Sequence, residues 1–95
     1  MEIDGLRKQI DLLDDTLLRV FSERAQVAIE IGRIKKELGL AVFDPGRENR
    51  IFSRMKEGNI GPLDDEAVVR LFERVIDESS RLERIRSQKK DSREC

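Results

Sequence analysis

The chain has 95 residues, enough for one domain, and its 19 Lys+Arg against 20 Asp+Glu give a formal net charge of -1, without the basic excess of a nucleic-acid-binding face. It contains no histidine and one cysteine, Cys95, which excludes histidine general bases, histidine-containing triads, Cys-rich zinc clusters and an intrachain disulfide. Any chemistry must therefore come from Arg, Lys, Asp, Glu, Ser and backbone groups.

The N-terminal segment carries Glu2 and Asp4 and lacks the apolar stretch of a signal peptide. No apolar run in the chain approaches the roughly 20 residues that span a bilayer. We therefore expect a soluble, cytoplasmic protein that does not bind a membrane.

A long helix is predicted from about residue 4 to about residue 38, with Asp4 as its N-cap and Gly39 as its stop. Apolar residues recur at spacings of three and four, and Arg24 occupies the one interrupted position. The series consists of Ile3, Leu6, Ile10, Leu13, Leu17, Val20, Val27, Ile31, Ile34 and Leu38.

The length of this helix predicts a homodimer. At 1.5 Å per residue it would be about 52 Å long, whereas a compact chain of this size has a radius of gyration of about 12–13 Å. The rest of the chain cannot cover the whole apolar stripe, so a second chain is expected to do so.

Two shorter helices follow. Asp44-Pro45 is typical of a helix start, because the carboxylate caps free N–H groups and proline suits the first turn. The segment 58–62 ends this helix, and Asp64 caps a third helix whose apolar face reaches Ile85. The predicted fold class is all-α, with a long, a short and a medium helix in an intertwined homodimer. The predicted domain covers residues 1–85, followed by a polar, disordered tail or linker at 86–95.

Two cations share a face of the first helix. Lys35 lies 11 residues after Arg24, about 16 Å along the helix and about 20° around it. Ala28 and Ile31 lie between them on the same face. This arrangement is typical of a site for a small dianion above an apolar floor.

Polar residues also interrupt the apolar faces of the other helices. Ser79 and Glu83 continue the stripe of Ile76 on the third helix, and Glu48 shares a face with Ile51 on the second. A single polar residue of this kind can be explained without a site, if that edge of the helix is exposed to solvent. Several exceptions on three helices favour a shared site.

The chain resembles the all-helical class of chorismate mutases over most of its length, from about Leu6 to Glu83. The segments that carry the resemblance are LRKQID at 6–11, LLD at 12–14, SER at 22–24, IGRIK at 31–35, DPGRE at 44–48 and RLF at 70–72.

The resemblance implies an intertwined dimer with two pockets, each built from both chains. It also implies the pericyclic rearrangement of chorismate to prephenate in the biosynthesis of phenylalanine and tyrosine, without a metal or cofactor. Such domains are sometimes fused to another shikimate-pathway enzyme.

The resemblance also implies roles for individual residues. Arg24 looks like the arginine that binds one substrate carboxylate, and Lys35 like the lysine that reaches the other carboxylate and the ether oxygen. Glu48 looks like the acceptor for the substrate hydroxyl, with Asp44 beside it and Arg47 as a supporting arginine.

On the third helix, Ser79 and Glu83 match a polar pair that faces the substrate, and Ile31 and Ile76 match the apolar walls. Some members have Gln where this chain has Glu83. An ionised carboxylate cannot donate a hydrogen bond to the ether oxygen, whereas a protonated one can.

Arg7 looks like the arginine donated by the partner chain. It precedes Arg24 by 17 residues, about 25 Å on a straight helix, so the two cannot reach one small ligand in the same chain. The alternative is a surface arginine that pairs with Asp11.

Two other functions stay open. An isochorismate-pyruvate lyase would use the same scaffold and a similar pocket. A non-catalytic helical dimerisation module would use the polar exceptions only structurally.

Overall fold

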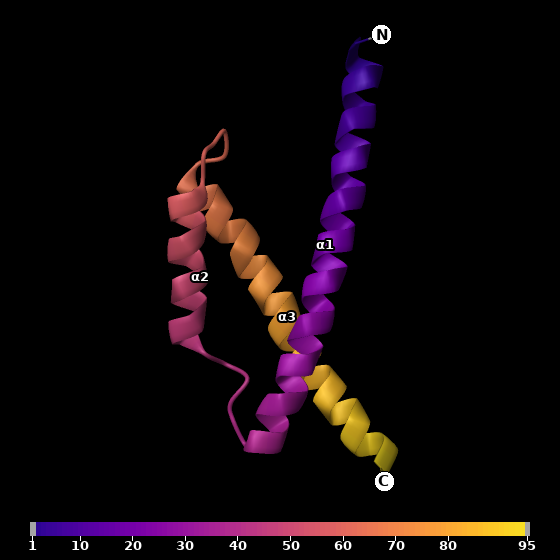
Figure 1. Cartoon of the computed structure of the whole chain (residues 1–95), viewed down its shortest axis with the longest axis vertical. Helices are drawn as coiled ribbons and strands as arrows, with labels where there is room; N and C mark the ends of the chain where they lie inside the picture. Colours follow the sequence, from indigo (N-terminus) through magenta and orange to yellow (C-terminus); the bar gives the residue numbers. More distant parts are fainter. Residues whose placement is uncertain (1, 95) are drawn as a thin grey trace.

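The computed structural model of the chain describes residues 2–94, with side chains as far as residue 85, and this part contains three α-helices and no β-strand. The helices are α1 (Glu2–Leu38), α2 (Pro45–Gly58) and α3 (Asp65–Glu94) (Figure 1). The predicted all-α fold is therefore confirmed. None of the helices in this part of the chain combines the length and apolar character needed to cross a membrane.

Local chemistry sets most of the helix ends. The Asp44 carboxylate accepts a 3.1 Å hydrogen bond from the backbone N–H of Arg47, and Asp64 accepts one of 2.7 Å from the N–H of Ala67. Gly39 follows α1 with a φ of 70°, a left-handed conformation that glycine adopts without strain. These predicted caps are confirmed.

Two helix boundaries differ from the predicted ones. Helix α1 begins at Glu2, so Asp4 lies in its first turn rather than at the N-cap, where its charge still favours the helix dipole. Helix α3 continues to Glu94 beyond the predicted end near Ile85, because Ser, Gln, Lys, Arg and Glu tolerate a helix without an apolar face. The side chains of residues 86–95 lie outside the described part, and their role as a linker stays a prediction.

Helix α3 is central, since it packs against both α1 and α2. The core is small: its buried apolar residues are Ala28 from α1, Ile51 from α2, and Val68 and Ile76 from α3. The molecule measures 58 × 29 × 14 Å, and its radius of gyration is 16.9 Å, against about 12 Å for a compact chain of this length. A single copy is therefore elongated and has little interior.

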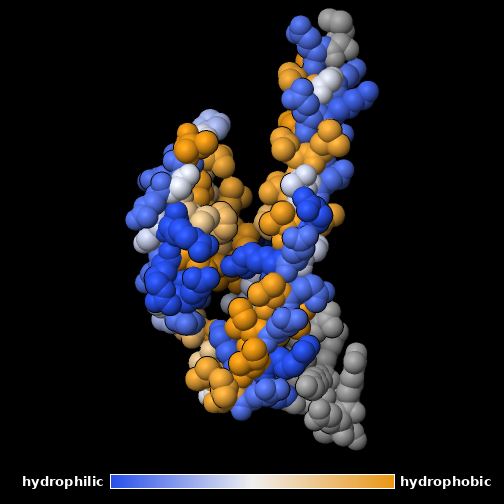
Figure 2. Space-filling model, viewed as in Figure 1, coloured by the Kyte–Doolittle hydropathy of each residue, from blue (hydrophilic) through white to orange (hydrophobic). Residues whose placement is uncertain are grey.

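The N-terminal half of α1 extends beyond the other helices (Figure 1), and apolar side chains follow it (Figure 2). Leu6 is 56% exposed and Leu13 is 62% exposed, and Ile3, Ile10 and Leu17 are also uncovered. Monomeric soluble proteins rarely expose a continuous apolar stripe of this length.

Candidate active site

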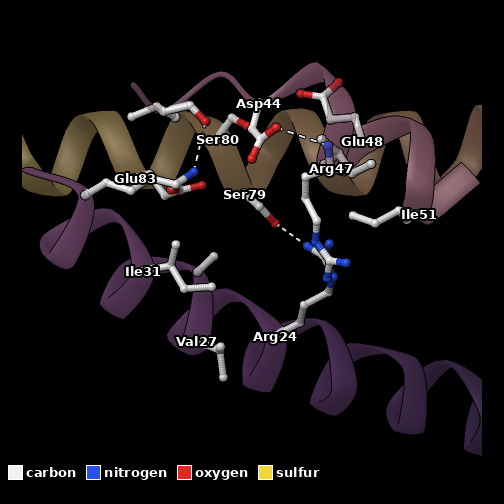
Figure 3. Close-up of a pocket in the computed structure, with 14 residues that line it drawn as sticks. Arg24, Val27, Ile31, Asp44, Arg47, Glu48, Ile51, Ser79, Ser80 and Glu83 are labelled. Atoms are coloured by element: carbon white, nitrogen blue, oxygen red, sulfur yellow. Dashed lines mark hydrogen bonds and ion pairs between the residues drawn. The ribbon is translucent and has the colours of Figure 1, made fainter. Parts of the chain in front are cut away.

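A cavity of about 350 Å³ lies between α1 and α3, where the loop before α2 and the first turn of α2 close it. This volume is within the range of small-molecule sites. Every predicted site residue except Arg7 lines it. These residues are Arg24, Ile31 and Lys35 from α1; Asp44, Arg47 and Glu48 from the loop and α2; and Ile76, Ser79 and Glu83 from α3 (Figure 3).

Arg24 is held from the opposite helix. Its Nη1 donates a 2.6 Å hydrogen bond to Ser79 Oγ, and the Ser79 hydroxyl donates in turn to the carbonyl of Val75 at 2.9 Å. Because the hydroxyl proton is directed to its own helix, the Ser79 oxygen is free to accept from Arg24. This chain of bonds orients the guanidinium and leaves its other N–H groups available to a ligand.

Positive charge is concentrated around Arg24. Burial lowers the pKa of the Arg24 guanidinium, the charges of Arg47 and Arg54 lower it further, and Glu83 opposes them. Figure 3 shows the Arg47 side chain reaching from α2 towards the Arg24 guanidinium. An arginine stays protonated at neutral pH even so. An anion between the guanidinium groups would relieve their repulsion, which favours an anionic ligand.

Lys35 and Glu83 form a second charged pair in the cavity. Lys35 Nζ donates to the Val42 carbonyl at 3.0 Å and lies 3.3 Å from Glu83 Oε1. Glu83 is only 7% exposed, and its Oε1 has no hydrogen-bond partner among the described residues, so the contact with Lys35 is an ion pair without hydrogen-bond geometry. A buried carboxyl oxygen without a hydrogen bond is costly unless a ligand supplies one.

Gly32 determines where Glu83 lies. At this point α1 and α3 approach so closely that a Cβ on Gly32 would lie 2.8 Å from Glu83 Cβ, 2.9 Å from Cγ and 3.0 Å from Cα. Only a residue without a side chain permits this approach. The glycine therefore brings the backbone of α3 against α1 and places the Glu83 carboxyl beside Lys35.

We expect Gly32→Ala to destabilise the fold by about 1–3 kcal/mol, the usual cost of overpacking, because the added methyl meets the α3 backbone. Gly5→Ala is the matched control on the same helix. No atom lies within 4 Å of its added Cβ, and it is expected to stabilise the helix by roughly 0.5–1 kcal/mol. Urea denaturation of both variants measures the difference, and equal stabilities would contradict this account of the crossing.

The α2 N-terminus completes the cavity. Asp44 and Glu48 both face it, and Glu48 is half-buried while its backbone N–H is bonded to the Asp44 carbonyl at 3.1 Å. The cap formed by Asp44 therefore starts α2 beside the cavity, with Glu48 in its first turn.

Arg7 is exposed in the projecting half of α1 and lies outside the cavity. A single chain therefore does not bring it to the other predicted site residues.

The family model described as chorismate mutase type II matches residues 6–84, most of the chain. The chain belongs to this family.

Individual chorismate mutases are similar over nearly the whole chain. The bifunctional chorismate mutase/prephenate dehydratase of Aquifex aeolicus is 37% identical over 87 residues, which cover 87% of this chain and 24% of that protein. The chorismate mutase of Thermus thermophilus (form II) has a TM-score of 0.87 and 38% identity, with 88% of this chain and 96% of that chain covered. The Helicobacter pylori chorismate mutase in complex with prephenate has a TM-score of 0.84 and 26% identity, with 90% of this chain and 93% of that chain covered.

The chain spans about a quarter of the length of the bifunctional relative. That relative carries the kind of fusion expected from the resemblance, between a chorismate mutase and another enzyme.

Two features of this chorismate mutase family member were missed by sequence reasoning. Ser80 lines the cavity beside Ser79. It follows Ile76 by four residues on the same helix face, so its place in the site could have been predicted from this spacing. The Val42 carbonyl binds Lys35, but a backbone acceptor in a loop leaves no trace in residue type.

Proposed function

We propose that the chain is a chorismate mutase that converts chorismate to prephenate. The observation that carries the proposal is the placement of Arg24 and Lys35, about 16 Å apart along α1, in one cavity with an apolar floor and the buried carboxyl of Glu83. The family and the Helicobacter pylori relative in complex with prephenate support it.

The reaction is an intramolecular rearrangement in which a C–O ether bond breaks and a C–C bond forms. It uses no nucleophile from the protein, and no atom is gained or lost. The protein accelerates it by holding the reactive conformer of the substrate and by stabilising charge on the ether oxygen as the bond breaks.

Each side chain then has a defined part. Arg24, oriented by Ser79, binds one carboxylate of the substrate. Lys35 reaches the other carboxylate and the ether oxygen, and Glu48 accepts a hydrogen bond from the substrate hydroxyl. Ile31 and Ile76 form the apolar walls, with Asp44 beside Glu48 and Arg47 as a supporting arginine.

The test is direct incubation of purified protein with chorismate, following chorismate loss and prephenate formation. Isochorismate is the control substrate. Prephenate formation supports the proposal, whereas release of pyruvate from isochorismate would favour the lyase. No consumption of either isomer would favour the dimerisation module.

Glu83 is proposed to donate a hydrogen bond to the ether oxygen in its protonated form, which would supply the missing partner of its buried Oε1. Glu83→Gln replaces the carboxyl by an amide that also donates a hydrogen bond, so it should keep most of the wild-type kcat. Glu83→Ala is the control that removes the donor. Equal losses of kcat in Glu83→Gln and Glu83→Ala would exclude Glu83 from this role.

The homodimer is part of the proposal. The uncovered apolar stripe on the projecting half of α1 is the surface that a second α1 would cover, in an antiparallel arrangement. That arrangement would bring the partner's Arg7 towards Arg24 and complete the ligand site. Light scattering of the purified protein measures the predicted dimer mass.

A mixing experiment tests the origin of Arg7. Arg7→Ala and Lys35→Ala are each expected to be nearly inactive, but mixed dimers contain one intact site. Random assortment after co-refolding should restore about one quarter of wild-type activity. No recovery in a mixture shown to contain mixed dimers would contradict donation of Arg7 across chains.

A further inference from the structure

The charges that line the cavity cancel within one chain. The cationic lining residues are Arg24, Lys35 and Arg47, and the carboxylates are Asp44, Glu48 and Glu83. These charges cancel when all of the groups are ionised and leave a net charge of +1 when Glu83 is protonated, so the lining by itself attracts a dianion weakly from a distance. Cationic groups outside the lining would strengthen this attraction.

Arg54 is placed to supply it. Arg47, Ile51 and Arg54 follow one face of α2 at spacings of four and three, and the first two line the cavity. Arg54 is exposed and does not itself line the cavity, but it follows Ile51, which does, by about one helical turn. Its charge is close enough to lower the pKa of the Arg24 guanidinium.

The charge of Arg54 is not neutralised locally. No carboxylate of the described residues lies within ion-pair distance of it, in contrast to Arg74, which pairs with Glu78 at 2.7 Å. Figure 2 shows a hydrophilic surface over α2 beside the hollow that separates it from α1. The field of Arg54 therefore extends into the entrance of the cavity.

We propose that Arg54 is a substrate-capture residue that makes the entrance positive and attracts the dianionic substrate without contacting its reacting atoms. This inference rests on the proposed chorismate mutase function. It assigns Arg54 an effect on substrate encounter and affinity, separate from the rearrangement itself.

The test compares Arg54→Gln with Lys56→Gln. Both changes remove one positive charge from an exposed position on α2, but Lys56 lies about 140° around the helix from Ile51, and Arg54 about 60°. For Arg54→Gln, kcat/KM at low ionic strength should fall by about 3- to 10-fold. The loss should shrink as salt rises, because the Debye length falls to about 3 Å at 1 M. The change in kcat should stay within about twofold, and Lys56→Gln should match the wild-type protein.

Arg54→Glu should increase the loss and steepen the salt dependence. If the wild-type protein turns over chorismate but Arg54→Gln has an unchanged kcat/KM and salt dependence, the role of Arg54 is wrong and the proposed function stands. Equal losses in Arg54→Gln and Lys56→Gln would show an effect of net charge alone and would also overturn it. A wild-type protein without chorismate turnover overturns both.

Discussion

Replacing Lys35 by alanine is expected to lower kcat for chorismate by on the order of 10²-fold or more, the scale of removing one preorganised donor. Lys35 Nζ is fixed between the Val42 carbonyl at 3.0 Å and Glu83 Oε1 at 3.3 Å, so it needs little reorganisation to meet charge on the ether oxygen. Steady-state kinetics with chorismate measures the effect.

The matched control is Lys56→Ala on the exposed surface of α2, which should keep wild-type kcat. Because Lys35→Ala leaves the buried Glu83 carboxyl without its cation, circular dichroism and thermal unfolding must show that the variant is still folded. Activity within twofold of the wild-type protein in a folded Lys35→Ala variant would refute the assignment of Lys35.

Arg24→Met is expected to lower kcat/KM by on the order of 10²-fold or more while the protein keeps or gains stability. The catalytic loss follows from removal of the group that Ser79 orients towards the ligand. The folded protein should keep its stability because burial and the charges of Arg47 and Arg54 disfavour the charged form of Arg24. The lowered pKa of the Arg24 guanidinium reflects this cost. Chorismate kinetics and urea denaturation on the same variant test both parts.

Arg84→Met is the control, since Arg84 is exposed on α3 and outside the cavity lining. It should leave kcat/KM close to the wild-type value. Full activity of Arg24→Met would remove Arg24 from the site, and strong destabilisation would show that Arg24 is needed for folding. An arginine that is unfavourable for stability and required for activity is the expected pattern at a binding site.

Much of the local fold could be predicted from residue pattern. The apolar spacing of three and four gave α1 to within two residues of Leu38 and Glu2, and Asp44, Asp64 and Gly39 gave correct helix ends. These features depend on interactions within one or two helical turns, which a sequence displays directly. The end of α3 was predicted too early, because apolar residues do not recur at helical spacing after Ile85. The backbone is nevertheless helical to Glu94.

The candidate site could be predicted in part. Arg24, Lys35 and Glu83 stood out as charged residues on faces expected to be apolar, and the structure places all three around one cavity. Arg54 did not stand out, because an exposed arginine on a helix is ordinary until its neighbours are known. The assembly that would bring Arg7 to the cavity stays a prediction.

The sequence by itself determined the three helices, the caps at Gly39, Asp44 and Asp64, and the absence of histidine and reactive cysteine chemistry, because composition and short-range periodicity suffice for these. Only the tertiary structure decided how closely the helices cross. The gap of 2.8 Å between a Cβ on Gly32 and Glu83 Cβ depends on packing between residues 51 positions apart, and no local pattern reports such a contact. That crossing places the buried carboxyl beside Lys35 and turns scattered polar residues into a site.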